Sequence, residues 1–212
     1  MNRVKLLGRR EIHVVPLFFV IVASALTFVV TVTHPVSAIQ YSNYTSDKYQ
    51  VQFQYPSTWT LNEKTNRFET GSEIKIDSPN LDFFGIGYAD DLIRGFGTTN
   101  LQSAVIDFLK GITSDYTKDY RVIESPSFIK IGNESAGTFL YTIQDKYETT
   151  PTNIAHQIWI VFVGNHGYTI SFLGSPSTFD SPENTEIRDH FLKSIKFLGN
   201  TTTTSNSTGR FG

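Results

Sequence analysis

The chain contains 212 residues, with 18 basic and 20 acidic side chains and no cysteine. This length is sufficient for one domain with a sizeable core, and the small negative net charge argues against a nucleic-acid partner, which needs a basic surface. The absence of cysteine excludes disulfides, thiolate catalysis, cysteine-based zinc sites and a lipid anchor on cysteine. The 17 Phe and 10 Tyr, with few charges, indicate a packed core.

The N-terminal segment predicts export. A basic cluster precedes an uncharged apolar run from Val14 to Val32, and Val36 and Ala38 stand at the −3 and −1 positions of a small-residue cleavage site. The run approaches the roughly 20 residues that span a bilayer. Residues 1–38 are therefore predicted to be a signal peptide cleaved near Ala38 or an N-terminal membrane anchor, and the rest of the chain to be extracytoplasmic.

Periodicity predicts strands and two helices in the body of the chain. The first helix runs from Thr99 to Tyr116, with a capping box formed by Thr99 and Gln102. The second begins with Ser181 as N-cap and continues to Leu198. The predicted strands are 48–55, 67–77, 82–89, 120–131, 135–146, 154–163 and 167–173.

The segment from Ile154 to Gly174 predicts a hairpin with its loop at residues 165–166. The predicted pairs on one face are Val163–Tyr168, Val161–Ile170 and Trp159–Phe172. Apolar residues occupy the other face too, and such strands are normally covered on both sides. The predicted fold class is α+β: an α/β/α sandwich with a central antiparallel sheet and helices on both faces, preceded by the N-terminal hydrophobic segment. This domain covers residues 39–198, and the Thr/Ser-rich tail, 199–212, is predicted to be disordered.

The stretch "VQFQYPSTW", Val51 to Trp59, alternates apolar and polar residues until Pro56 stops the pattern. Trp59 is then positioned to cover the end of the strand, and we expect it and Trp159 to be buried. The pattern Tyr49-x-Val51-x-Phe53-x-Tyr55-Pro56-x-x-Trp59 resembles the start of the PsbP-like domain, the family of the photosystem II extrinsic protein, related in fold to the Ran-binding Mog proteins. The hairpin 154–173 and the closing segment 186–198 match that family in kind.

The resemblance implies an α/β/α sandwich around an antiparallel sheet. It also implies a non-catalytic, membrane-associated accessory or binding module, without implying photosynthesis. Some members of the family bind Ca²⁺ or Mn²⁺, but no ligand motif maps onto residues of this chain. No cofactor or metal site is therefore assigned from the sequence.

The residues that could carry chemistry do not form a motif. The body has three histidines, His156, His166 and His190, and the first two are expected roughly 33 Å apart at the two ends of a strand. No nucleophile elbow and no complete phosphate-binding loop is present. Three acidic pairs are candidates for a weak cation site or an acid/base pair, with a solvated surface as the alternative: Asp90–Asp91, Asp77–Asp82 and Asp115–Asp119.

The loop from Asp90 to Thr99 places Leu92, Ile93 and Phe96 among glycine and charged residues. Exposed apolar side chains on a loop can mark a partner site, but these three could instead pack under the adjacent helix. Four sequons suit an exported protein and are predicted glycosylation sites: Asn43, Asn133, Asn200 and Asn206.

The sequence therefore predicts an exported, non-catalytic accessory or binding module at the outer face of the cell membrane. Its expected partners are the membrane, through the N-terminal segment, and a membrane protein complex. The alternative function is a cell-surface hydrolase that uses a carboxylate pair.

Overall fold

The computed structural model describes residues 38–64, 73–80, 82–114, 118–145 and 153–200. Its strands are β1 (Tyr41–Ser46), β2 (Val51–Pro56), β3 (Thr60–Glu63), β4 (Ile74–Asp77), β5 (Phe83–Ala89), β6 (Lys118–Ile131), β7 (Glu134–Asp145), β8 (Asn153–Val163), β9 (His166–Gly174) and β10 (Lys196–Phe197). Its helices are α1 (Leu92–Phe96), α2 (Leu101–Thr113), α3 (Pro182–Ser194) and the short 3-10 helix η1 (Leu198–Asn200). In the described ranges, no helix has the length and apolar character needed to cross a bilayer. The apolar run Val14–Val32 and the tail from residue 201 lie outside these ranges.

The largest element is a seven-stranded antiparallel sheet in the order β3-β4-β5-β9-β8-β7-β6. The predicted hairpin β8–β9 lies in its middle, but its predicted register was wrong by two residues. The turn is Gly164-Asn165, so that Val161 pairs with Tyr168 and Trp159 with Ile170. The turn begins one residue earlier than predicted because Gly164 adopts φ +60°, which suits the first position of a tight hairpin turn. A shift of two residues leaves each side chain on its predicted face.

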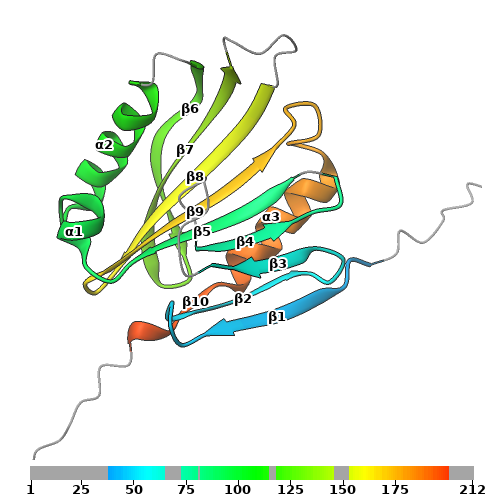
Figure 1. Cartoon of the computed structure of the whole chain (residues 1–212), viewed down its shortest axis with the longest axis horizontal. Coiled ribbons are helices and arrows are strands. Elements are labelled where there is room, and N and C mark those ends of the chain that lie inside the picture. The colour runs from blue at the N-terminus through cyan, green and yellow to red at the C-terminus, as the bar shows by residue number, and fades with distance from the viewer. Residues whose placement is uncertain (1–37, 65–72, 81, 115–117, 146–152, 201–212) are drawn as a thin grey trace, which may run out of the picture. The chain divides into compact units, whose positions relative to one another are not determined.

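Helices α1 and α2 cover one face of this sheet (Figure 1). Val105 of α2 is fully buried against Phe139 of β7 and Ile160 of β8. The helix begins one residue later than predicted, with Asn100 as its N-cap in place of Thr99. The Asn100 carboxamide oxygen accepts a 2.9 Å hydrogen bond from the Ser103 N–H, which satisfies one of the free donors of the first turn.

The other face is covered by α3 together with a second, three-stranded sheet in the order β1-β2-β10 (Figure 1). Phe191 of α3 stacks on Phe84 of β5 with ring centroids 4.0 Å apart and contacts Phe53 of β2. The antiparallel sheet is thus as predicted. The expected helices on both faces describe only part of the arrangement, because strands make up much of this second layer.

The predicted closing helix ends earlier than expected. Its N-cap is Ser181, as predicted, but α3 stops at Ser194. The Ser194 hydroxyl accepts a hydrogen bond from the Gln54 N–H and donates one to the Phe191 carbonyl oxygen. Ile195 is already extended, so Lys196 and Phe197 continue as β10 beside β2 and do not extend the helix.

The stretch that ends in Tyr-Pro forms β2, whose Val51 and Phe53 are fully buried. Pro56 is the last residue of the strand, and its carbonyl oxygen accepts a 2.9 Å hydrogen bond from the Trp59 N–H. This turn brings the Trp59 ring to 5.7 Å from the ring of Phe84. Trp59 is 9 % exposed and Trp159 is 4 % exposed, so the predicted burial of both tryptophans is confirmed.

Candidate functional site

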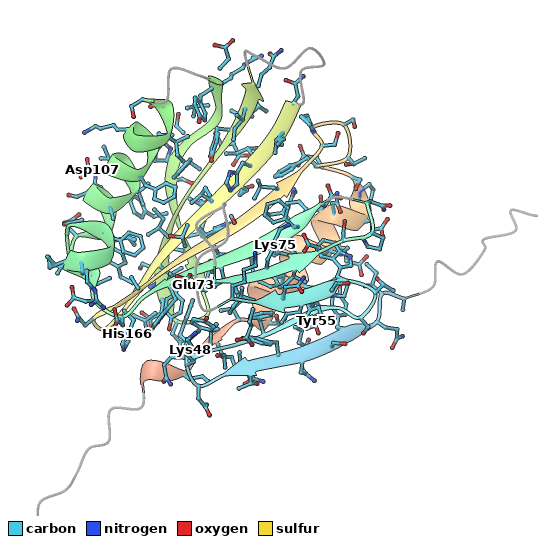
Figure 2. The ribbon with its side chains drawn as sticks, viewed as in Figure 1. Lys48, Tyr55, Glu73, Lys75, Asp107 and His166 are labelled. Atoms are coloured by element: carbon cyan, nitrogen blue, oxygen red, sulfur yellow. The ribbon has the colours of Figure 1, made fainter. Side chains whose placement is uncertain are left out.

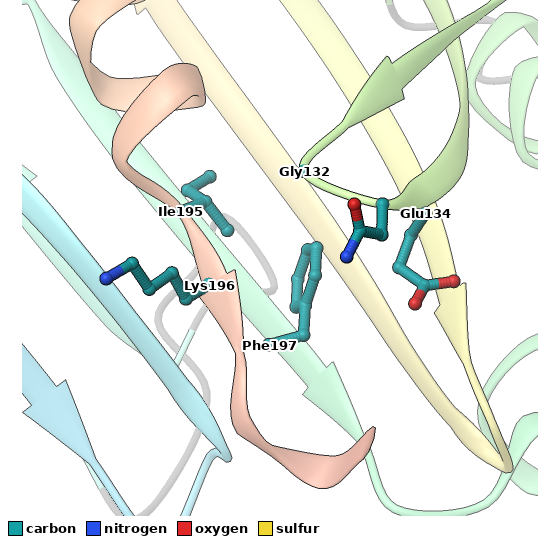
Figure 3. Close-up of a pocket in the computed structure, with 6 residues that line it drawn as sticks. Gly132, Glu134, Ile195, Lys196 and Phe197 are labelled. Carbon is teal, nitrogen blue, oxygen red and sulfur yellow. The ribbon is translucent and has the colours of Figure 1, made fainter. Parts of the chain in front are cut away.

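A small hollow lies where the β6–β7 turn meets the junction of α3 and β10 (Figure 3). Its volume is about 180 Å³, well below the roughly 300 Å³ of ordinary ligand pockets. Gly132, with φ +60°, opens the turn and brings the backbone close to the Ile195 carbonyl oxygen. The hollow is lined by Gly132, Asn133, Glu134, Ile195, Lys196 and Phe197. A cavity of this size and lining can hold a small ion or a single side chain.

A second hollow, of about 350 Å³, separates the end of β6 from α3. Its lining combines Lys130 and Gly132 with Asp189, Leu192 and Lys193 of the helix. The Lys130 ammonium donates a 3.0 Å hydrogen bond to the Ser135 hydroxyl, and the Lys193 ammonium lies 3.5 Å from an Asp189 carboxylate oxygen. Both lysines are therefore held by neighbours on the protein.

His156 of β8 faces Tyr141 of β7. Its Nδ1 lies 2.6 Å from the Tyr141 hydroxyl oxygen, and its Nε2 is buried without a hydrogen-bond partner among the described residues. Burial lowers the pKa of His156 to about 3 and raises the pKa of Tyr141 above its ordinary value. Both groups are therefore neutral at pH 7, and this pair does not suit a general acid or base working there.

The other two histidines have separate partners on separate elements. His166 lies at the start of β9 (Figure 2), and its Nδ1 is 3.0 Å from the Tyr88 hydroxyl oxygen. His190 of α3 lies 2.7 Å from the Gln54 carboxamide oxygen and stacks on Tyr41 at 3.6 Å. The three histidines therefore lie at separate places in the structure. The sequence analysis had likewise expected His156 and His166 to lie apart.

The members of the predicted acidic pairs also contact different partners. Asp77 lies 2.6 Å from the Lys75 ammonium, whereas Asp82 is 6 % exposed and accepts a hydrogen bond from the Asn184 side chain of α3. Asp115 lies outside the described residues. Within the described ranges, no three His, Cys, Asp or Glu side chains lie in an arrangement that could hold a metal ion.

The loop with three apolar residues contains the short helix α1, which buries Leu92 and partly buries Phe96. Leu92 is 4 % exposed, and the Phe96 ring lies 5.1 Å from the Phe162 ring of β8. Ile93 is 58 % exposed. Of the three residues predicted for partner contact, Leu92 and Phe96 thus pack against the sheet, and Ile93 alone is presented to solvent.

Acidic side chains hold α1 in this position. Asp91 caps the helix by accepting a 2.8 Å hydrogen bond from the Arg94 N–H, and it also accepts one from the Asn165 side chain at the β8–β9 turn. These hydrogen bonds lower the pKa of Asp91, and the Arg94 guanidinium lowers the pKa of Asp90. This acidic pair therefore has a structural role as a cap and an ion pair. By contrast, Asp107 on the outer side of α2 points away from the sheet (Figure 2).

The sequons differ in their surroundings. Asn43 lies in β1, where its side-chain oxygen accepts a 2.9 Å hydrogen bond from Gln54. Asn133 is exposed in the β6–β7 turn. Asn200 ends η1, and Asn206 lies outside the described residues. Glycosylation of all four remains a prediction.

The sequence analysis missed one group of exposed apolar residues on β6. We name it the β6 edge patch; it consists of Val122, Ile123, Phe128 and Ile129, which are 40 %, 49 %, 51 % and 39 % exposed. Only Ile93 and Ile106 are comparably exposed among the large apolar residues that the structure describes. A signal was available, because Pro126 interrupts this strand and proline within a strand is typical of a sheet edge.

Comparison with known proteins identifies the fold of this chain but gives no match by sequence. No family model matches the chain, and no curated protein sequence does so. The architecture is nevertheless a PsbP-like fold, as the resemblance at β2 predicted. Cyanobacterial PsbP from Synechocystis, known from its solution structure, is 12 % identical to this chain, with a TM-score of 0.55 over 77 % of this chain and 95 % of that one.

Weaker structural similarity extends to LpqN, a protein involved in cell envelope biogenesis of Mycobacterium tuberculosis. That structure is 10 % identical, with a TM-score of 0.44 over 75 % of this chain and 91 % of that one. A Bacteroides thetaiotaomicron protein is 18 % identical, with a TM-score of 0.48 over 75 % of this chain and 49 % of that one. At these identities the similarity concerns the fold alone.

Proposed function

We propose that the chain is an exported, non-catalytic PsbP-like accessory or binding module that acts by contact at the outer face of the cell membrane. The observation that carries this proposal is the distribution of the groups that could do chemistry. His156, His166 and His190 have three different partners, and the carboxylates of Asp77, Asp82, Asp90 and Asp91 serve as caps, ion pairs or hydrogen-bond acceptors. Catalysis needs such groups to converge in a pocket.

The location in this proposal rests on the N-terminal sequence. The basic cluster, the apolar run Val14–Val32 and the small residues before Ile39 form an export signal or anchor. The intact mass of the protein from its native cells separates the two forms: cleavage after Ala38 removes the segment, and an anchor retains it. Full-length protein recovered from the cytosolic fraction would contradict both.

For contact with a membrane protein complex we propose the exposed side of α1, with Ile93 at its centre. Leu92 and Phe96 fix the helix to the sheet, and Asp91 ties it to the β8–β9 turn. Ile93 is therefore presented on a rigid support, which limits the entropy lost on binding. A buried contact of this kind is worth a few kcal/mol at most and suits a weak, specific association.

The test compares capture of partners from detergent-solubilised native membranes by the full chain and by two variants. Ile93→Ser should lose the specific partner without a change in melting temperature. Ile106→Ser is the matched control, because Ile106 is also exposed but lies on α2, and it should retain the partner. Equal capture by both variants would remove α1 from the proposal. Hydrolase activity of the purified chain that disappears on substitution of one described carboxylate would overturn the non-catalytic role itself.

A further inference from the structure

The β6 edge patch lies on a strand that is open on both faces and along one side. In the seven-stranded sheet, β6 pairs with β7 and has no second neighbour among the described strands. All of residues 121–130 are exposed. Phe128 pairs with Gly137 and lies on the α2 side, whereas Ile129 pairs with Ala136, which belongs to the core on the α3 side. A partner docked on one face would cover only one of these apolar side chains, but an added strand would lie beside both.

The β6–β7 turn determines which backbone groups point outward. Its two residues, Gly132 and Asn133, close on the pair Ile131–Glu134, which in a two-residue hairpin is a hydrogen-bonded pair. Backbone groups alternate along a strand, so those of residues 128 and 130 point away from β7. Gly132 and Lys130 line the hollow between the end of this strand and α3.

We propose that this edge pairs with β6 of a second copy of the chain, in antiparallel orientation, over residues 127–131. In the proposed register Ile129 lies opposite Ile129 of the second copy, and Phe128 lies opposite Lys130 of the second copy. This register places the outward-pointing groups of residues 128 and 130 in hydrogen-bonded positions. One face gains an Ile–Ile contact, and the other gains contacts between the Phe128 ring and the lysine chain beside it.

Charge and proline select this register over its neighbours. One neighbouring register pairs Lys130 with Lys130 of the second copy. Like charges directly opposite each other destabilise a sheet, so this register is disfavoured. Shifting the pairing in the other direction extends the new ladder to Pro126, which has no N–H and lies in the irregular stretch between Glu124 and Ser127. The segment is thus complementary to itself in one register, which favours a second copy over an unrelated strand. This association does not depend on the proposed role at the membrane.

The chain has no cysteine, so a single introduced cysteine reports the contact without background. In the proposed register the two copies of residue 129 form a non-hydrogen-bonded pair with Cα atoms about 4.5 Å apart, within the range that a disulfide spans. The full chain is purified in detergent as Ile129→Cys, Phe128→Cys or Ile106→Cys and oxidised with diamide. Ile106 is the matched control because it is also 39 % exposed but lies on α2.

We expect Ile129→Cys to form a disulfide-linked dimer about tenfold faster than Ile106→Cys, since only a paired strand holds the two thiols at bonding distance. Phe128→Cys alone should be slower than Ile129→Cys but should cross-link to Lys130→Cys when the two variants are mixed. Equal rates for Ile129→Cys and Ile106→Cys would overturn the paired edge. Faster dimerisation of Phe128→Cys than of Ile129→Cys would overturn the register. Unchanged melting temperatures of the reduced variants exclude unfolding as the cause.

Discussion

Strands β8 and β6 are both apolar at consecutive positions, and yet one is the centre of the core and the other is open to solvent. In β8, Ile158 and Ile160 face α2 while Trp159 and Val161 face α3, and all four are buried. In β6, residues 121–130 are exposed throughout. The difference comes from position in the sheet: β8 lies between β7 and β9 and is covered on both faces, whereas β6 is the last strand. Apolar character therefore indicates a strand, but its place in the sheet determines whether that strand is core or contact surface.

The largest test of this contrast is Trp159→Ala in the central strand. The indole is 4 % exposed, and its removal leaves a cavity between the sheet and the α3 layer. We expect the free energy of unfolding to fall by about 3–5 kcal/mol. Urea denaturation followed by circular dichroism measures the change. A native-like midpoint would show that the central strand is not the packed core described here.

The second test measures how the stability of the chain depends on pH through His156, which pairs with Tyr141 on the α2 side of the sheet. The folded-state pKa of His156 is about 3, below the ordinary value of 6.5, so the unfolded chain binds more protons between these pH values. Stability contributed by the neutral ring is therefore full above pH 6.5 and decreases as the pH falls towards 3. The slope approaches about 1.4 kcal/mol per pH unit, or roughly 2–3 kcal/mol between pH 6.5 and pH 4.5.

The matched variant for this test is His156→Gln, which keeps a polar partner for Tyr141 but does not titrate. Unfolding free energies of both proteins are measured from pH 7 to pH 4, so that the titration of carboxylates common to both cancels. The wild-type chain should lose more stability than the variant as the pH is lowered. Parallel curves would mean that His156 is accessible to solvent and protonates in place.

The third test addresses how tightly α2 covers the sheet. A Cβ on Gly137 of β7 would overlap the Cγ2 of Val105, which is fully buried, so that Gly137→Ala forces α2 away from the sheet. We expect a loss of about 1–3 kcal/mol. The control is Gly111→Ala within α2, where a Cβ meets no atom within 4 Å and should stabilise the helix by about 0.5–1 kcal/mol. Thermal unfolding should separate the two variants in opposite directions.

The smallest expected effect is at the open edge. Phe128 is 51 % exposed, so Phe128→Ser should change the free energy of unfolding by no more than about 0.5 kcal/mol in dilute protein. Denaturation at a concentration low enough to keep the chain monomeric measures this. A loss comparable to that of Trp159→Ala would place Phe128 in the core and remove the distinction between the two strands.

Several features of the fold could be predicted from the local sequence pattern. Proline ends β2 at residue 56, a turn from Pro56 to Trp59 follows it, and Ser181 caps α3. Each of these depends on neighbours within a few positions in the chain. The loop from Asp90 to Thr99 was recognised as unusual, but which of its apolar side chains faces solvent depends on contacts with β8 and β9.

By itself, the sequence determined most of the longer strands, the two longer helices, the apolar hairpin and the burial of both tryptophans, because periodicity, capping and hydrophobicity act over short stretches of chain. The tertiary structure alone decided that the last apolar residues leave α3 to form β10 beside β2, and that Ile93 remains exposed while Leu92 is buried and Phe96 is partly buried. These outcomes depend on pairing between segments far apart in the sequence, such as Gln54 with Ser194, whose free energy no local pattern encodes.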